Sequence, residues 1–203
     1  MPTSTSTTRN LQRSATNPGR PTVPATVVLG IDPGTLVTGF GVVARRGSAL
    51  QLVASGAIAN PSGSSLPERL HTIHTRLLEV IAEHAPDQCA IESAFYGKNA
   101  QSALKLGHAR GVCLLAAMQH GLTPAEYTPR EVKKAVVGNG NASKDQVQYM
   151  VKALLGLDQL RMRSDTSDAI AIALCHIHRR SSPVAHHRDW RAYVTAHPEK
   201  VKS

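Results

Sequence analysis

The chain has 203 residues and a formal net charge of +9, and 41% of its residues are apolar, which is enough for about one domain. Aromatic residues make up only 3%, too few for a platform on which single-stranded bases stack. No run approaches the roughly 20 apolar residues of a membrane span. The three cysteines lie far apart, which argues against a zinc site or a disulfide framework and favours a reducing compartment.

The basic charge is concentrated at the two ends of the chain. Residues 1–25 are rich in Ser, Thr, Asn and Pro, contain Arg but no acid, and are predicted to be a disordered tail. Residues 181–203 are predicted to be a second basic tail, and residues 26–180 the folded domain between them. Basic tails on a nearly neutral domain indicate a polyanionic partner, most often nucleic acid. Tails that serve only solubility are the alternative.

Short apolar runs bounded by Gly, Pro or Asn predict strands, and Ser or Thr three residues before Glu or Gln predicts helix N-termini. In chain order, the sequence predicts strands at 25–31, 38–44 and 50–59, a helix from Ser65 to about His84, a strand at 89–91, a helix over 99–120, a strand at 124–127, and helices beginning near Thr128, Ser143 and Ser164. A meander followed by alternating helices and strands predicts an α/β fold, a mixed five-stranded sheet flanked by helices.

Four acidic residues lie at the ends of these elements. Asp32 ends the first strand, Glu92 ends the fourth, and Asp165 and Asp168 share one face of the last helix. Acids at strand ends of an open sheet point into the crevice where such folds bind ligands. Clustered carboxylates without His or Cys suit Mg²⁺ or Mn²⁺. Singly, each has a plainer interpretation: a turn, a strand end at the surface, or a complement to the helix dipole.

Six segments together resemble one protein family. They are IDPG at 31–34, GFG at 39–41, AIESAF at 90–95, NAQSALKLGHARG at 99–111, VKKAVVG at 132–138 and DTSDAIAIA at 165–173. The chain over roughly residues 26–178 resembles the RuvC family of bacterial Holliday-junction resolvases. That resemblance implies a ribonuclease-H-like fold. It also implies a crossover junction endodeoxyribonuclease of DNA recombination and repair that makes paired symmetric nicks in a four-way DNA junction.

By this resemblance, Asp32, Glu92, Asp165 and Asp168 match the catalytic, metal-binding acids of the family. Some relatives carry His at the position of Asp165, where this chain keeps Asp. The implied chemistry is phosphodiester hydrolysis with two Mg²⁺ ions per site, or Mn²⁺ in their place, leaving 5′-phosphate and 3′-hydroxyl ends. The resemblance further implies a cytoplasmic bacterial homodimer and suggests a branch-migration complex of the RuvAB type as a partner.

The predicted DNA-binding residues follow the same resemblance. Lys133 and Lys144 match basic DNA-contacting positions of the family, and Arg130 and Lys134 are nearby supports. Lys144 also stands in the first turn of a helix, where a cation opposes the dipole and a bound phosphate would remove the conflict. A solvated surface lysine is the alternative. For Phe95, or Tyr96 beside it, we expect stacking on an unpaired junction base, although a ring folded into the core is the alternative.

Small residues on the second long helix bear on assembly. Gly107 and Gly111 are four apart, with Ala103 one turn earlier, so their face permits close helix approach. A two-fold dimer would present two active sites to a two-fold junction. Packing of this face on the chain's own sheet is the alternative. His71 and His74 are three apart but lack a third ligand nearby, and we interpret them as surface residues.

Two other functions remain open from the sequence alone. An Asp-x-Gly-Thr turn before a second strand also begins actin-like ATPases, but these enclose their nucleotide between two such domains. A protein that binds junctions without cutting them is the second alternative. Four clustered acids argue against it, because they would repel a polyanion and add nothing to binding.

Overall fold

The computed structural model describes residues 24–93, 100–157 and 162–181. Its centre is a five-stranded sheet of order β3-β2-β1-β4-β5, in which β1–β2 and β2–β3 are antiparallel and β1–β4 and β4–β5 are parallel. The strands are β1 (Thr26–Asp32), β2 (Val37–Arg46), β3 (Ala49–Ala59), β4 (Gln88–Glu92) and β5 (Ala125–Tyr127). The predicted mixed sheet is confirmed.

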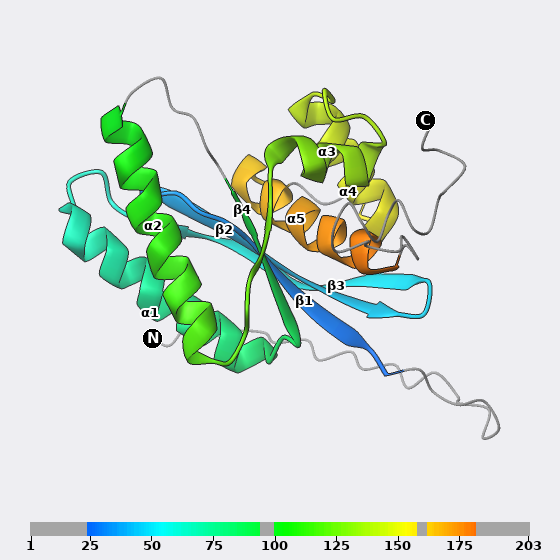
Figure 1. Cartoon of the computed structure of the whole chain (residues 1–203), viewed down its shortest axis with the longest axis horizontal. Coiled ribbons are helices and arrows are strands. Elements are labelled where there is room, and N and C mark those ends of the chain that lie inside the picture. The colour runs from blue at the N-terminus through cyan, green and yellow to red at the C-terminus, as the bar shows by residue number, and fades with distance from the viewer. Residues whose placement is uncertain (1–23, 94–99, 158–161, 182–203) are drawn as a thin grey trace, which may run out of the picture.

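Five helices complete the described fold: α1 (Leu66–His84), α2 (Ala100–Gln119), α3 (Pro129–Val137), α4 (Lys144–Leu155) and α5 (Ser164–Ser181). Ser65, Thr128 and Ser143 cap α1, α3 and α4, each in a capping box with Glu or Gln three residues later, as predicted. Figure 1 shows α1 and α2 on one face of the sheet and α3, α4 and α5 on the other. Within the described residues, no helix is long and apolar enough to cross a membrane.

The alternation of side chains along the strands divides the interior into two cores. Val28 and Val43 face α5 and pack with its Ile170. Leu29 and Ile31 face the opposite side and pack with side chains of α1 and α2. Because successive strand residues point to opposite faces, one apolar strand such as β1 supplies both cores.

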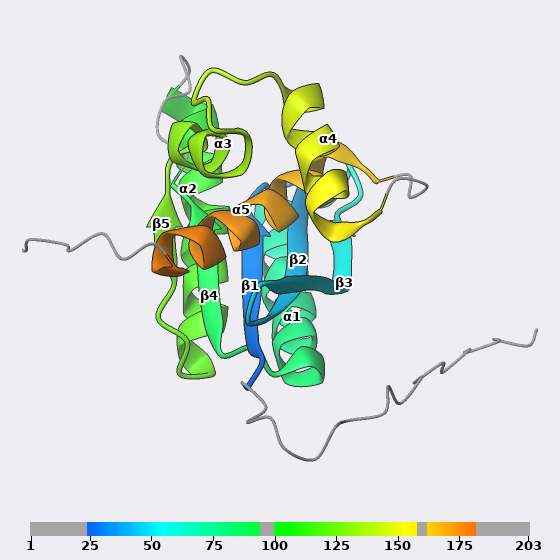
Figure 2. The same ribbon diagram turned by 90° about the vertical axis from the view of Figure 1, so that its right-hand side faces the viewer.

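Three glycines let α5 lie directly on β1 and β2 (Figure 2). Gly30 and Gly41 are paired across the two strands, and Gly39 pairs with Asp32. A Cβ added to Gly41 would lie 2.6 Å from Ile170 Cγ1, and one added to Gly39 would lie 2.7 Å from the carbonyl carbon of Asp165. No side chain fits there, so the first turn of α5 lies against the residue that pairs with Asp32.

Candidate active site

The structure brings the predicted acids together at one end of the sheet. Asp32 and Glu92 are the last residues of β1 and β4, which are adjacent and parallel, with Ile31 opposite Ile91. The two carboxyl groups lie close enough that the charge of Glu92 helps to raise the pKa of Asp32, after the larger effect of burial. Asp165 and Asp168 approach from the first turns of α5. The acids therefore come from three elements that are distant in sequence.

The electrostatics of this cluster favour a bound cation. Burial raises the pKa of Asp32 to about 8, and the neighbouring charge of Glu92 adds to that rise, as do Asp168 and Asp165. Burial also raises the pKa of Glu92. A divalent cation would stabilise the ionised forms of all these groups, and an all-carboxylate donor set is the kind that Mg²⁺ and Mn²⁺ prefer. The donor types therefore fit the implied metal, and in this structure the described side chains are not gathered around a single point.

The turn after β1 is fixed by hydrogen bonds from two side chains. The buried Thr38 hydroxyl donates to the carbonyl of Gly34 at 2.7 Å and accepts from its N–H at 3.3 Å. Asn60, just beyond β3, donates through its side chain to the carbonyl of Thr35 at 3.1 Å. Asp32 is the last residue of β1, and these hydrogen bonds anchor the short connection from Pro33 to Leu36 that follows it.

A cavity of about 340 Å³ opens at the acids. Asp32, Glu92 and Asp168 line it together with Lys133 from α3 and Lys144 from α4. The other described residues that line it are apolar: Pro129, Val132, Val147, Ala171 and Ile172. Arg130 and Lys134 lie on α3 and are exposed, but they do not line this cavity. Phe95 and Tyr96 lie outside the described residues.

Lys144 has a partner that the sequence did not reveal. Its Nζ lies 3.2 Å from Asp168 Oδ2, forming an ion pair between α4 and α5. The pKa of Lys144 is raised, chiefly by the charge of Asp168. Within the described parts of the chain, no three His, Cys, Asp or Glu side chains are gathered around one point that could hold an ion. One of the four acids, Asp168, is turned toward a lysine.

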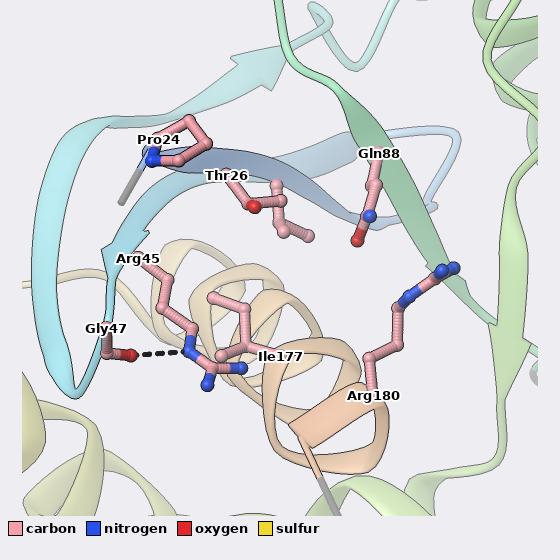
Figure 3. Close-up of a pocket in the computed structure, with 8 residues that line it drawn as sticks. Pro24, Thr26, Arg45, Gly47, Gln88, Ile177 and Arg180 are labelled. Carbon is pink, nitrogen blue, oxygen red and sulfur yellow. Dashed lines mark hydrogen bonds between the residues drawn. The ribbon is translucent and has the colours of Figure 1, made fainter. Parts of the chain in front are cut away.

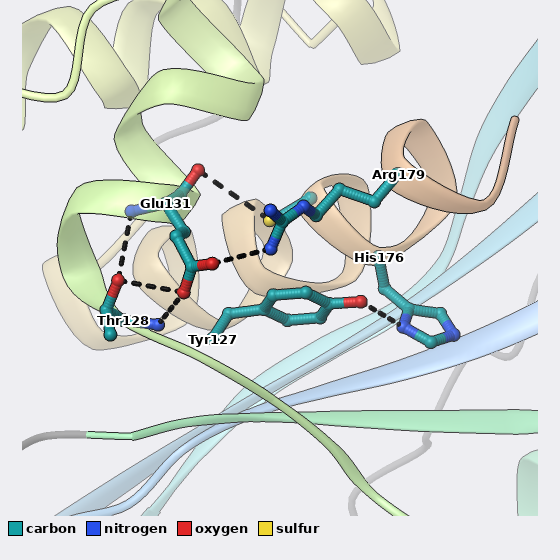
Figure 4. A network of polar contacts seen from close by, with 6 residues as sticks. Tyr127, Thr128, Glu131, His176 and Arg179 are labelled. Carbon is teal, nitrogen blue, oxygen red and sulfur yellow. Dashed lines mark hydrogen bonds and ion pairs between the residues drawn. The ribbon is translucent and has the colours of Figure 1, made fainter. Parts of the chain in front are cut away.

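A polar network behind the cavity joins α3, α5 and β5 (Figure 4). Glu131 completes the capping box of α3, and its Oε1 accepts a hydrogen bond from Arg179 of α5 at 2.6 Å. The Arg179 guanidinium lies over the Tyr127 ring, 5.5 Å from its centroid. The Tyr127 hydroxyl is 2.9 Å from Nδ1 of the buried His176. Since Tyr127 pairs with Glu92 across β4–β5, this network supports both Glu92 and the helix of Lys133.

A second cavity of about 250 Å³ lies at the other end of β1, away from the acids (Figure 3). Arg45 and Arg180 line it with Thr26 and Gln88, and Arg45 Nε donates to the carbonyl of Gly47 at 2.8 Å. None of the described residues that line it is an acid, so this lining differs from the donor set of the first cavity. His74 Nε2 is hydrogen bonded to Gln119 Oε1 at 2.8 Å, and His71 is exposed. Both observations agree with the assignment of these histidines as surface residues.

The mixed sheet, with acids at the ends of β1 and β4 and on the helix across it, defines a nuclease of the ribonuclease-H-like class. The family model described as crossover junction endodeoxyribonuclease RuvC matches residues 28–176. The chain belongs to the RuvC family.

Individual relatives agree with the family assignment. The RuvC of Chloroherpeton thalassium is 44% identical over 183 residues, covering 86% of this chain and 98% of that protein. RuvC of Pseudomonas aeruginosa is 52% identical over 161 residues, which cover 79% of this chain and 91% of that protein. The solved structure of Thermus thermophilus RuvC with a Holliday junction substrate is 37% identical, with a TM-score of 0.72 and coverage of 76% and 94%. The yeast mitochondrial Holliday junction resolvase Ydc2, 12% identical with a TM-score of 0.57, shares the fold.

Proposed function

We propose that this protein is a metal-dependent endonuclease that resolves Holliday junctions by paired nicks, with residues 26–180 as its nuclease domain. The observation that carries the proposal is the cavity in which Asp32, Glu92 and Asp168 meet Lys133 and Lys144. Acids alone would repel DNA, and lysines alone would bind it without cutting. The two together suit a site that binds a phosphodiester and hydrolyses it.

In this proposal the four acids hold two Mg²⁺ ions, with Mn²⁺ as an alternative. When bound, the metal would activate water and stabilise negative charge on the phosphate and the leaving 3′ oxygen. Asp32 is central because its carboxyl is within interaction range of Glu92, Asp165 and Asp168. The positions of the acids are set by β1, β4 and α5, and rigid elements hold reacting groups more closely than loops do.

Lys133 and Lys144 would bind the phosphates on either side of the cut, since both line the cavity. Arg130 and Lys134 would bind phosphates further away, because they are exposed on α3 outside the cavity. Phe95 or Tyr96 would stack on an unpaired base at the junction centre. That the T. thermophilus relative was solved with a Holliday junction substrate supports the choice of DNA.

The outer side of α2 supports a homodimer. Leu104, Leu115 and Met118 are 63%, 54% and 53% exposed, and an added Cβ on Gly107 or Gly111 would meet nothing within 4 Å. Their spacing places all five on one side of the helix, opposite the buried Cys113 and Ala116, and we call them the α2 stripe. The glycines do not pack on the chain's own sheet. A second α2 across a two-fold axis would cover the stripe.

Cleavage of a synthetic four-way junction tests the proposal. The full-length protein should nick two opposite strands symmetrically with Mg²⁺, leaving 5′-phosphate ends that a ligase seals. It should not do so in EDTA, and a linear duplex of the same sequence should be cut far more slowly. Equal cutting of junction and duplex would contradict junction resolution. Metal-independent cutting would contradict the assignment of the acids.

A further inference from the structure

We propose that Lys144 acts as a resident counter-ion of the acid cluster. Its ammonium holds Asp168 in the free protein and leaves it when a DNA phosphate arrives, so that DNA and the divalent cation bind cooperatively. This inference rests on the proposed function and adds a mode of regulation to the same site. The observation that carries it is the 3.2 Å ion pair between Lys144 Nζ and Asp168 Oδ2 at the cavity.

The backbones that carry this pair are fixed. Ser143 caps α4 immediately before Lys144: its hydroxyl accepts from the Gln146 N–H at 3.2 Å, and its own N–H donates to Gln146 Oε1 at 2.9 Å. Val147 and Val151 of α4 are buried in the same core as the apolar side chains of α5. The cap and the packing of α4 therefore hold the backbone of Lys144. Any exchange of partner occurs through rotation of its flexible four-carbon side chain.

The contact itself is weak enough to exchange. The Lys144 side chain is 75% exposed and that of Asp168 only 27%, so water screens the pair from the lysine's side. Lys144 also stands in the first turn of α4, where the helix dipole disfavours a cation and favours an anion. A phosphate at this position would satisfy the lysine and the helix terminus at once. Asp168 would then be available to a divalent cation.

Lys133 provides a matched comparison within the same cavity. It lines the wall from α3, and both lysines lie close enough to lower the pKa of Glu92 against the effect of its burial. Among the described residues, however, only Lys144 forms an ion pair with one of the four acids. Removing either lysine removes one positive charge near the site, but only removal of Lys144 breaks the ion pair of Asp168 and leaves it with the long 3.5 Å hydrogen bond from the Ser164 hydroxyl.

Direct measurement of Mn²⁺ binding without DNA, by the electron paramagnetic resonance signal of free Mn²⁺, tests the first half of the proposal. Lys144→Gln should bind Mn²⁺ about two- to five-fold more tightly than the wild type, the range expected for loss of one exposed ion pair. For Lys133→Gln, the increase in Mn²⁺ affinity should be clearly smaller. Equal affinity of Lys144→Gln and wild type, or equal gains in the two variants, would overturn the proposal. If even the wild type binds no Mn²⁺, the proposed metal-dependent function fails with it.

The proposal also predicts that binding of the junction and binding of the divalent cation are thermodynamically coupled. Coupling between two ligands is reciprocal, so the effect of the metal on DNA affinity reports the effect of DNA on metal affinity. The affinity of a fluorescent four-way junction should be measured by anisotropy with Ca²⁺ and with EDTA. Ca²⁺ should tighten junction binding by a larger factor in the wild type than in Lys144→Gln, while Lys133→Gln should keep the wild-type factor. The same factor in all three proteins would overturn the coupling.

Discussion

The helices on the two faces of the sheet are packed in different ways. On one face, α5 lies against strand backbone at Gly30, Gly39 and Gly41, with no room for a Cβ. On the other face, bulky side chains such as Leu29 and Ile31 fill the space between the sheet and the helices. The face with the closest packing is the one whose helix carries Asp165 and Asp168.

The difference shows that one residue type serves two purposes. Glycines under α5 fix the distance between a helix and the strand that ends in Asp32. Gly107 and Gly111 on α2 face open space instead, and they belong to a surface that we propose to be covered by a second chain. Substitution on the first face should alter the chemistry, and substitution on the second should alter assembly.

Outside the acid cluster, the largest loss of activity is expected from substitution of Gly39. Gly39→Ala places a Cβ against the backbone of Asp165 and should destabilise the fold by about 1–3 kcal/mol, the usual cost of overpacking. Displacing the first turn of α5 by about 1 Å should slow cleavage at saturating junction about 100-fold. Urea unfolding and single-turnover cleavage measure the two effects. Gly63→Ala is the control, since an added Cβ there meets nothing within 4 Å. Wild-type cleavage by Gly39→Ala would show that close packing of α5 is unnecessary.

The next effect is expected at the α2 stripe. Burial of a Leu side chain contributes roughly 1.5–3 kcal/mol, and a two-fold interface buries two copies. Leu115→Lys should therefore weaken the dimer about 100-fold or more while hardly changing the unfolding of the monomer. Analytical ultracentrifugation measures the first and thermal unfolding the second. Val53→Lys on β3, also an exposed apolar residue, should leave assembly unchanged. A Leu115→Lys protein that dimerises normally would place the interface elsewhere.

The smallest effect is expected in the network behind the cavity. The pKa of Glu131 is lowered, first by the backbone hydrogen bond from Thr128 and then by Arg179. Because the folded-state pKa lies below the unfolded value, the stability from the ionised carboxylate is present above about pH 4.5 and is lost as pH falls through the folded-state pKa. Glu131→Gln keeps a capping side chain and removes the charge, and should cost about 0.2–1 kcal/mol at pH 7 because the pair is half exposed.

Urea unfolding of both proteins as a function of pH measures this difference, which should shrink as the pH falls below 4.5. Glu79→Gln, which breaks the more exposed pair with Arg76, should cost less. A Glu131→Gln difference that stays constant down to pH 3 would show that the charge of Glu131 does not stabilise the fold.

Much of the fold follows from local signals in the sequence. The capping boxes at Ser65, Thr128 and Ser143 locate three helices because the side chains that satisfy the first N–H groups are only three residues away. Asp32 and Glu92 are recognisable as site residues because apolar runs end at each. Local sequence and the RuvC resemblance together were enough to propose all four acids.

The contacts that sequence reasoning missed are long-range. Lys144 and Asp168 are 24 residues apart and Glu131 and Arg179 are 48 apart, and no periodicity connects them. Gly39 was recognised within a motif, but its role depends on a helix that follows more than a hundred residues later. Such pairings are set by how α5 docks on the sheet, which tertiary packing decides.

In the mechanism that we propose, the acids at the ends of β1 and β4 perform the cleavage while the lysines hold the DNA. Asp32→Asn tests it on a single labelled four-way junction, with affinity measured in EDTA and nicking measured in Mg²⁺. We expect no detectable nicking, together with junction affinity equal to or tighter than that of the wild type, because a negative charge near the phosphates is removed. Nicking by Asp32→Asn at close to the wild-type rate would contradict the account.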